Sequence, residues 1–147
     1  MIRIEQEIDI HCPVAEVFRF MANISNHQNF CGAFTETRQL SAGDFGVGTR
    51  VRKVSSFLGK EVVAEQEVIA YEPDQLISLQ VISGPVPGQE SYLFEEIEGG
   101  TRLKVILLAK PQGVLSLAAP VLKTKIKNQM AADFYNLKRI LESELRR

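Results

Sequence analysis

Cysteines, histidines and long apolar runs are scarce in this sequence, and each scarcity excludes a class of structure. Only two cysteines, Cys12 and Cys31, occur among the 147 residues. They do not form a Cys-x-x-Cys pair, and a globular domain of this size needs no disulfide, so we expect both thiols to be reduced. The two histidines, His11 and His27, have no familiar zinc-ligand spacing, so we expect no structural metal.

A membrane-spanning segment and an excess of one charge are also missing. No run of 18 or more apolar residues occurs, and the first five residues carry charges at alternate positions instead of a basic segment followed by an apolar one. The net charge of −1 gives no global electrostatic reason to expect nucleic acid or an anionic membrane as partner. We expect a cytoplasmic protein with no nucleic-acid partner and no stable membrane insertion.

Apolar residues are plentiful enough for a real core. They make up 45% of the sequence, and a chain of this length buries roughly two-thirds of its unfolded surface. No internal repeat, low-complexity segment or linker divides the chain, so we expect one domain over residues 1–147.

The N-terminal segment changes period at a proline. Residues 2–10 alternate between apolar and charged side chains, which predicts a strand with one dry face, interrupted only by Gln6. Pro13 suits the first position of a helix, and helical spacing of apolar residues continues to about Asn23. Ser25 to Gln28 has the form of a capping box, which predicts further helical turns to about Phe30.

Turn signals divide the next part of the chain into six predicted strands, at residues 34–40, 47–58, 60–71, 76–83, 90–97 and 101–109. The longest irregular segment lies between the fourth and fifth of these, where prolines and glycines prevent a regular ladder and an ordinary loop or a lid would fit.

The last segment is helical. From residue 121 one apolar stripe recurs at steps of three or four, which predicts a helix of some 26 residues, about 39 Å long. The stripe comprises Leu122, Ile126, Met130, Phe134, Leu137, Leu141 and Leu145. Consecutive strands followed by a long helix indicate an α+β fold with an antiparallel meander.

Four segments in this order resemble the START-like, or helix-grip, superfamily, which includes polyketide cyclase/dehydrase-like proteins and the birch pollen allergen family. They are residues 8–18, a strand leading to a proline-started helix; 46–50, a glycine-rich entry to a strand; 68–73; and 94–103, a strand and its tight turn. One departure is visible, because Asn23, Gln28 and Phe30 stand where many relatives have an acidic residue, a proline and a tryptophan.

The resemblance implies a curved sheet of about seven strands with two short helices after the first strand and the long helix packed over its concave face. It also implies a cavity between sheet and helix that commonly holds lipids, polyketides, hormones or other apolar molecules. It does not imply a reaction, because one fold hosts unrelated functions.

Strand alternation predicts which side chains face that cavity. Extending the pattern from Val51 places Lys53 and Ser55 inside, extending it from Val62, Ala64 and Val68 places Gln66 inside, and Tyr92 and Phe94 bring Glu90 with them. A large apolar pocket with a few convergent polar groups is the general design of a small-molecule site. The ligand-binding candidates are Gln6, Val51, Lys53, Gln66, Glu90, Tyr92, Phe94, Met130 and Phe134.

Two of these predictions depend on strand register. A slip of one residue, a bulge or a strand end would move Lys53 or Glu90 to solvent. If both face inward, each must be paired or neutralised, because burying an isolated charge is costly. A Lys53–Glu90 pair, or Tyr92 beside Glu90, would then be able to do acid–base work.

An apolar stretch, the two histidines and a short basic run remain to be interpreted. The apolar stretch 114–119 is either the core-facing start of the long helix, kinked at Pro120, or a gate at the cavity mouth or a homodimer contact. His11 and His27 are interpreted as surface or capping residues rather than acid–base groups, and Lys123, Lys125 and Lys127 as a solvated helix face.

Three functions compete. The first is a carrier or sensor of a small hydrophobic molecule that needs no cofactor. The second is an enzyme of the aromatase/cyclase type that uses Lys53, Glu90, Tyr92 or Gln66. The third is an interaction module like the family branch that activates a chaperone ATPase, with an exposed apolar surface around Val114 to Leu122.

Overall fold

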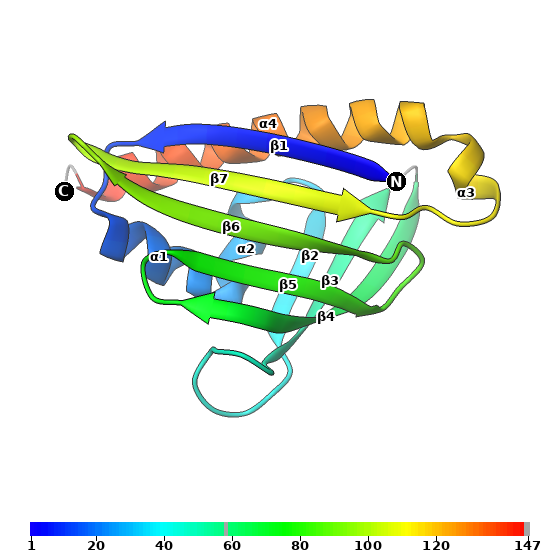
Figure 1. Ribbon diagram of the computed structural model, residues 1–147, viewed down its shortest axis with the longest axis horizontal. Helices are drawn as coiled ribbons and strands as arrows, with labels where there is room; N and C mark the ends of the chain where they lie inside the picture. Colours follow the sequence, from blue (N-terminus) through cyan, green and yellow to red (C-terminus); the bar gives the residue numbers. More distant parts are fainter. Residues whose placement is uncertain (58, 146–147) are drawn as a thin grey trace.

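The computed structural model describes residues 1–57 and 59–145, in which a curled antiparallel sheet of seven strands carries a long helix (Figure 1). The strand order is β1-β7-β6-β5-β4-β3-β2, so every neighbour except β1 beside β7 is consecutive in the chain. The elements are β1 (Ile2–Ile10), α1 (Val14–Ala22), η1 (Ile24–Asn26), α2 (His27–Phe30), β2 (Phe34–Gln39), β3 (Arg50–Phe57), β4 (Lys60–Glu72), β5 (Leu76–Ser83), β6 (Gly88–Ile97), β7 (Gly100–Ala109), α3 (Val114–Leu117) and α4 (Ala119–Leu145).

The first strand has the predicted bounds and the predicted alternation. Ile2, Ile4 and Ile10 are buried, and Gln6 turns toward α4, where its Nε2 donates a hydrogen bond to the backbone oxygen of Lys127 at 3.4 Å. Pro13 differs by one position from the prediction. It is the N-cap of α1, because its ψ of 143° is still extended while its carbonyl accepts from the backbone of Glu16 and Val17.

The predicted capping box at Ser25 is wrong. Asn23 is the N-cap of η1, and its side chain accepts a hydrogen bond from the backbone N–H of Ser25. Gln28 instead faces β2, where its Oε1 accepts from the backbone of Thr37 at 2.9 Å and its own N–H donates to the Thr37 hydroxyl at 3.1 Å. This reciprocal pair holds α2 against the sheet.

Two strand starts also differ from the prediction. β3 begins at Arg50 and not at Val47, because Gly46 and Thr49 close a turn through two hydrogen bonds of 3.0 Å, with Gly48 at φ 91°. Its predicted end, Leu58, lies outside the described residues. β6 begins at Gly88, which pairs with Ala109, so the irregular segment before it is shorter than predicted.

The C-terminal helix is interrupted earlier than Pro120. α3 and α4 are separate helices that meet at Ala118, and Pro120 is the second residue of α4, where its missing N–H costs nothing. The 27 residues of α4 span about 40 Å, and the helix runs beside β1 over the concave side of the sheet (Figure 1). The apolar stripe is buried or partly buried from Leu122 to Leu141, and the side chain of Leu145 lies outside the described part of the chain.

The core divides into two clusters along the inner face of the sheet. The larger one joins α1, α2 and the C-terminal half of α4 to the middle of the sheet, around Phe18, Leu79 and Leu137. The smaller one, around Ile4 and Leu122, lies at the end of the sheet near α3. Met130 packs against both clusters.

Candidate functional site

The buried polar side chains of the inner face gather around Glu90 on β6. Lys53 on β3 donates to Glu90 Oε1 at 2.5 Å, and the side chains are only 4% and 14% exposed. The Gln66 amide and the Tyr92 hydroxyl are also hydrogen-bonded to this carboxylate. One carboxylate on the concave side of the sheet therefore has three side-chain donors from three different strands.

The curl of the sheet brings these residues together. β3 and β6 are separated by β4 and β5, so they are three steps apart, or roughly 14 Å along a sheet with about 4.8 Å between strands. Two long side chains reaching toward each other across the concave face close that gap. The paired register of β3 with β4, in which Lys53 lies opposite Ala64, fixes the inward direction of Lys53.

The ion pair sets the electrostatics of the cluster. Burial alone would raise the pKa of Glu90, but the charge of Lys53 and its hydrogen bond outweigh that effect and hold the pKa below its usual value. Burial and then the negative charge of Glu90 raise the pKa of Tyr92 well above 10. At neutral pH the cluster thus contains a carboxylate and a phenol that keeps its proton.

His27 belongs to this cluster. It is the C-cap of η1, where its backbone N–H donates to the carbonyl oxygen of Ile24, but its interpretation as a surface residue is wrong. The side chain is fully buried, with its ring centroid 5.9 Å from that of Tyr92. Burial, followed by the charge of Lys53, lowers the pKa of His27 to about 4, so the ring is neutral at pH 7. Nε2 lies 2.9 Å from the carbonyl oxygen of Met21, which can only accept, so Nε2 carries the proton and Nδ1 is a bare acceptor.

Two buried acceptors of the cluster have no hydrogen-bond partner in the described residues. They are Nδ1 of His27 and Oε1 of Gln66. A buried polar atom left without a partner costs about 1–3 kcal/mol, so two such atoms in one cluster need an explanation. Both atoms would be satisfied by a molecule that donates hydrogen bonds.

A second carboxyl group enters from the long helix. Asp133 accepts from the backbone of Gly32 at 3.0 Å and from Gln129 at 2.7 Å, and the Cys31 thiol donates to it. Burial raises the pKa of Asp133, and burial together with this neighbouring charge raises the pKa of Cys31. These bonds fasten α4 to the connection between α2 and β2, and they keep the thiol protonated.

The structure places the remaining candidates on the same inner face. Val51, Phe94 and Phe134 are buried in the larger apolar cluster, and Met130 is partly buried at its border. Gln6 lies farther along β1 and contacts the backbone of α4 instead of Glu90. The polar group around Glu90 therefore joins Lys53, Gln66, Tyr92 and His27, with Gln6 apart from it.

Part of the inner face is accessible to solvent. Several inward apolar side chains of the sheet and of α4 are only partly buried; they are Val62, Ala64, Val81, Leu107, Ile126 and Met130. Solvent therefore reaches part of the apolar side chains on this face.

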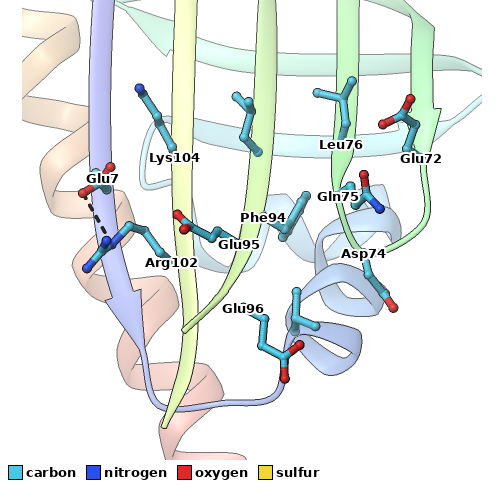
Figure 2. Close-up of a pocket in the computed structure, with 12 residues that line it drawn as sticks. Glu7, Glu72, Asp74, Gln75, Leu76, Phe94, Glu95, Glu96, Arg102 and Lys104 are labelled. Atoms are coloured by element: carbon cyan, nitrogen blue, oxygen red, sulfur yellow. Dashed lines mark ion pairs between the residues drawn. The ribbon is translucent and has the colours of Figure 1, made fainter. Parts of the chain in front are cut away.

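A depression of about 760 Å³ is lined mainly by outward side chains of the sheet, and Phe94, one of the ligand-binding candidates, also lines it (Figure 2). Its lining is largely charged, including Glu95, Glu96 and Lys104, and Arg102 pairs there with Glu7 at 3.6 Å. Open, ion-paired surfaces of this kind bind water well and apolar molecules poorly, so the inner face is the better candidate site. In the described residues, no three His, Cys, Asp or Glu side chains gather as metal ligands, and no helix is long and apolar enough to cross a membrane.

Spacing could have identified the two residues that sequence reasoning missed. His27 lies three residues after Ile24 and three before Phe30, and all three are buried, so one helical face contains all of them. Asp133 stands between Met130 and Leu137 at steps of three and four, which places it on the apolar stripe of α4.

Comparisons with known proteins agree with this geometry. A family model described as polyketide cyclase/dehydrase and lipid transport matches residues 1–142. No curated protein sequence matches the chain. Solved structures with the same fold include a START superfamily protein from Mycobacterium smegmatis, with a TM-score of 0.83 and 10% identity over 97% of this chain and 99% of that chain. A protein from Thermus thermophilus has a TM-score of 0.81 and 16% identity over 97% of this chain and 98% of that chain. The Zhui aromatase/cyclase from a Streptomyces species has a TM-score of 0.75 and 13% identity over 97% of this chain and 94% of that chain.

Proposed function

Because the chain belongs to the polyketide cyclase/dehydrase and lipid transport family, we propose that it carries or senses a small hydrophobic molecule that donates hydrogen bonds. The molecule lies between the inner face of the sheet and α4, against the Glu90 cluster. The observation that carries this proposal is the pair of unpartnered buried acceptors, His27 Nδ1 and Gln66 Oε1.

The chemistry of the cluster favours a hydroxyl group over a carboxylate. Glu90 is ionised and would repel a second negative charge, and three side chains already donate hydrogen bonds to its carboxylate. His27 is neutral and offers a lone pair, as does the Gln66 carbonyl. A phenol, an enol or an alcohol on an apolar skeleton supplies the missing donors and leaves the ion pair undisturbed.

The apolar part of the molecule would contact the partly buried inward side chains of the sheet and of α4. Met130 lies at the border between the two core clusters, and Val51, Phe94 and Phe134 form the wall beyond it. Gln6 would lie at the far side of the same space. A cytoplasmic location is part of the proposal, because a sequence with only two cysteines has no disulfide framework of the kind typical of small secreted domains.

Two probes with the same naphthalene skeleton test the hydrogen-bond requirement. We expect 2-naphthol to bind at least tenfold more tightly than 2-methoxynaphthalene, which lacks the donor, because an unsatisfied buried acceptor costs about 1–3 kcal/mol. Binding is measured by calorimetry and by the thermal shift of the native protein. Equal affinity for the two probes, or no shift with either and with a panel of lipids, aromatics and polyketides, would refute the proposal.

A matched pair of variants locates the site. Gln66→Met removes the acceptor and keeps the side-chain length, so we expect the preference for 2-naphthol to fall to about threefold or less. Gln80→Met makes the same change at an exposed position of β5 and should leave the preference unchanged. A preference that survives Gln66→Met would show that the naphthol hydroxyl does not bond to Oε1 of Gln66.

A second candidate function is an enzyme of the cyclase or aromatase type, favoured by the contact between Glu90 and Tyr92. In that reaction the Glu90 carboxylate takes the proton next to a ketone, and the Tyr92 hydroxyl donates a hydrogen bond to the enolate oxygen. The enolate carbon then attacks a second carbonyl of the same chain and closes a ring, and the alkoxide formed there takes the proton back from Glu90. Loss of this hydroxyl together with the neighbouring α-proton releases water and leaves a C=C bond in the ring. Formation of a cyclised product from a poly-β-keto thioester, absent with Glu90→Gln, would support this candidate.

A further inference from the structure

The short helix α3 presents apolar side chains to solvent. Val114 is 83% exposed and Leu117 is 84% exposed, and Val121, in the first turn of α4, is 58% exposed. Figure 1 shows α3 projecting past the end of the sheet, at the opposite end of the molecule from α1. Single exposed apolar residues are ordinary, but three within eight positions on a projecting tip form a surface.

The fold holds this tip in place from the other side. Leu115, Ala118 and Ala119 pack against the smaller core cluster, together with Val86 from the connection between β5 and β6. Ser116 donates to the carbonyl oxygen of Gly113, which closes the turn. The outward direction of Val114 and Leu117 is therefore fixed by the packing of their neighbours.

The same part of the chain is positively charged, although the protein as a whole is not. Residues 105–132 contain four lysines and no aspartate or glutamate, whereas the net charge of the protein is −1. The lysines are Lys110, Lys123, Lys125 and Lys127, and all are exposed. Lys110 lies four residues before the start of α3, and the other three lie within about 12 Å of the start of α4, at 1.5 Å per residue.

We propose that α3 and the first turns of α4 form a docking surface for an anionic lipid bilayer. Val114, Leu117 and Val121 enter the boundary between headgroups and acyl chains, while the surrounding lysines contact lipid phosphates and carboxylates. Lysines on different sides of α4 suit this role, because their long side chains can extend to the headgroups around an apolar centre. The protein lies at the surface and does not span the bilayer.

The charge pattern argues against two other partners. In a symmetric dimer the same surface would face itself, so the four lysines would meet four lysines without a carboxylate between them. Nucleic acid would use the positive charge but not the apolar tip, and residues 105–132 contain neither arginine nor an aromatic side chain to stack on a base. An anionic bilayer uses both features.

The docking surface goes beyond the proposed ligand site and does not depend on it. Leu115 and Ala118 cover the smaller core cluster on one side, while Val114 and Leu117 on the other side meet the bilayer. A molecule moving between a membrane and the inner face would pass at this end. Vesicle binding and naphthol binding are separate measurements, so the failure of one proposal leaves the other standing.

Vesicle flotation with the purified full-length chain tests the inference. We expect the protein to float with vesicles of phosphatidylcholine containing 30% phosphatidylserine at 20 mM salt. We expect at least tenfold weaker binding to phosphatidylcholine alone and a comparable loss at 500 mM salt. No flotation with the anionic vesicles, or equal binding to both kinds, would overturn the proposal.

Two variants separate the apolar contribution from the charge. Leu117→Glu should weaken binding about tenfold or more, and its control is Val47→Glu, which places the same charge at a position 69% exposed in the loop before β3. The change of Lys123, Lys125 and Lys127 to glutamine should cost about fivefold per lysine. Its control changes three exposed arginines, Arg19, Arg38 and Arg139, to glutamine, which removes the same net charge.

Unchanged circular dichroism and thermal midpoint show that each variant is folded. If both control variants lose binding as much as the test variants, general charge and not this surface is responsible, and the proposal fails. Sedimentation without lipid supplies the last arm. If the wild type does not float but forms a concentration-dependent dimer that Leu117→Glu abolishes, the surface binds a second copy of the chain and the bilayer proposal fails. If the wild type is a monomer that floats with vesicles, the bilayer proposal is supported.

Discussion

Replacing Lys53 with methionine would remove one half of the buried ion pair and keep most of the side-chain volume. Glu90 would remain on the inner face, 14% exposed, without the charge that holds its pKa down. Breaking a buried pair from one side typically costs 3–5 kcal/mol. Because Gln66 and Tyr92 still donate to the carboxylate, we expect Lys53→Met to lower the free energy of unfolding by about 3 kcal/mol at pH 7.5.

The pH dependence of this loss distinguishes a buried pair from a surface one. In the wild type the folded pKa of Glu90 lies below its ordinary 4.5, so its contribution to stability is complete above pH 4.5 and is lost only as the pH falls through the folded pKa. In Lys53→Met the charge and the hydrogen bond of Lys53 are gone, and we expect burial, the largest effect on Glu90, to outweigh the remaining donors and raise the folded pKa above 4.5. The folded variant then binds more protons than the unfolded one, and its stability falls by about 1.4 kcal/mol per pH unit as the pH rises from 4.5 to the raised pKa.

Urea unfolding followed by far-ultraviolet circular dichroism measures both effects, since the chain contains no tryptophan for fluorescence. The difference between wild type and Lys53→Met should be small at pH 5 and grow with pH. The removal of the Lys53 charge from His27 acts in the same direction. A loss below about 1 kcal/mol that does not change between pH 5 and 8 would refute the buried pair. The double variant Lys53→Met, Glu90→Gln should recover most of the loss, because it leaves no unpaired charge.

Three further outcomes follow from individual positions. Burial lowers the pKa of His27 from 6.5 to about 4, so the wild type should lose about 3 kcal/mol of stability as the pH falls from 6.5 to 4. Urea unfolding of His27→Gln should show a smaller loss over that range. An identical pH profile for the two proteins would contradict the neutral buried ring. Gly100→Ala should lower the free energy of unfolding by about 2 kcal/mol or more in urea, because a Cβ would overlap the carbonyl oxygen of Ile10. Its control, Gly46→Ala, has open space around the new methyl group and should leave the free energy of unfolding nearly unchanged. Iodoacetamide at pH 8 should label Cys31 in urea but not in the native protein, because burial raises the pKa of the thiol; mass-spectrometric detection of rapid native labelling would disprove that burial.

Most of the fold could be predicted because each strand buries one face. Alternation set β1 to its exact residues, and tight turns at Glu72 and Gly99 delimited the strands around them. The differences arose where local hydrogen bonds decide a boundary. Thr49 bonds back to Gly46 and delays β3, and Asn23 takes the cap that Ser25 was expected to provide. Such bonds depend on side-chain direction, which periodicity does not contain.

The site was harder to predict than the fold, because its members meet only through the curl of the sheet. Alternation indicated that Lys53, Gln66 and Glu90 face inward, and the structure buries the first two and leaves Glu90 slightly exposed. It could not indicate that Lys53 reaches Glu90 across two intervening strands. His27 was missed for a related reason: a histidine in a polar stretch resembles a surface residue until the short helix that carries it is packed on the sheet.

The ion pair also bears on the shape of the inner face. β3 and β6 would be roughly 14 Å apart in a flat sheet, and the contact of 2.5 Å between Lys53 and Glu90 exists only while the sheet is curled. The pair therefore connects β3 and β6 across the concave face that α4 covers. The unpartnered acceptor of Gln66 lies beside this ion pair, because the Gln66 amide is bonded to the same carboxylate. A bound donor at Gln66 would complete the hydrogen bonds of the cluster without replacing any existing one. For this reason the same residues that fix the curvature are the ones we expect to select the ligand.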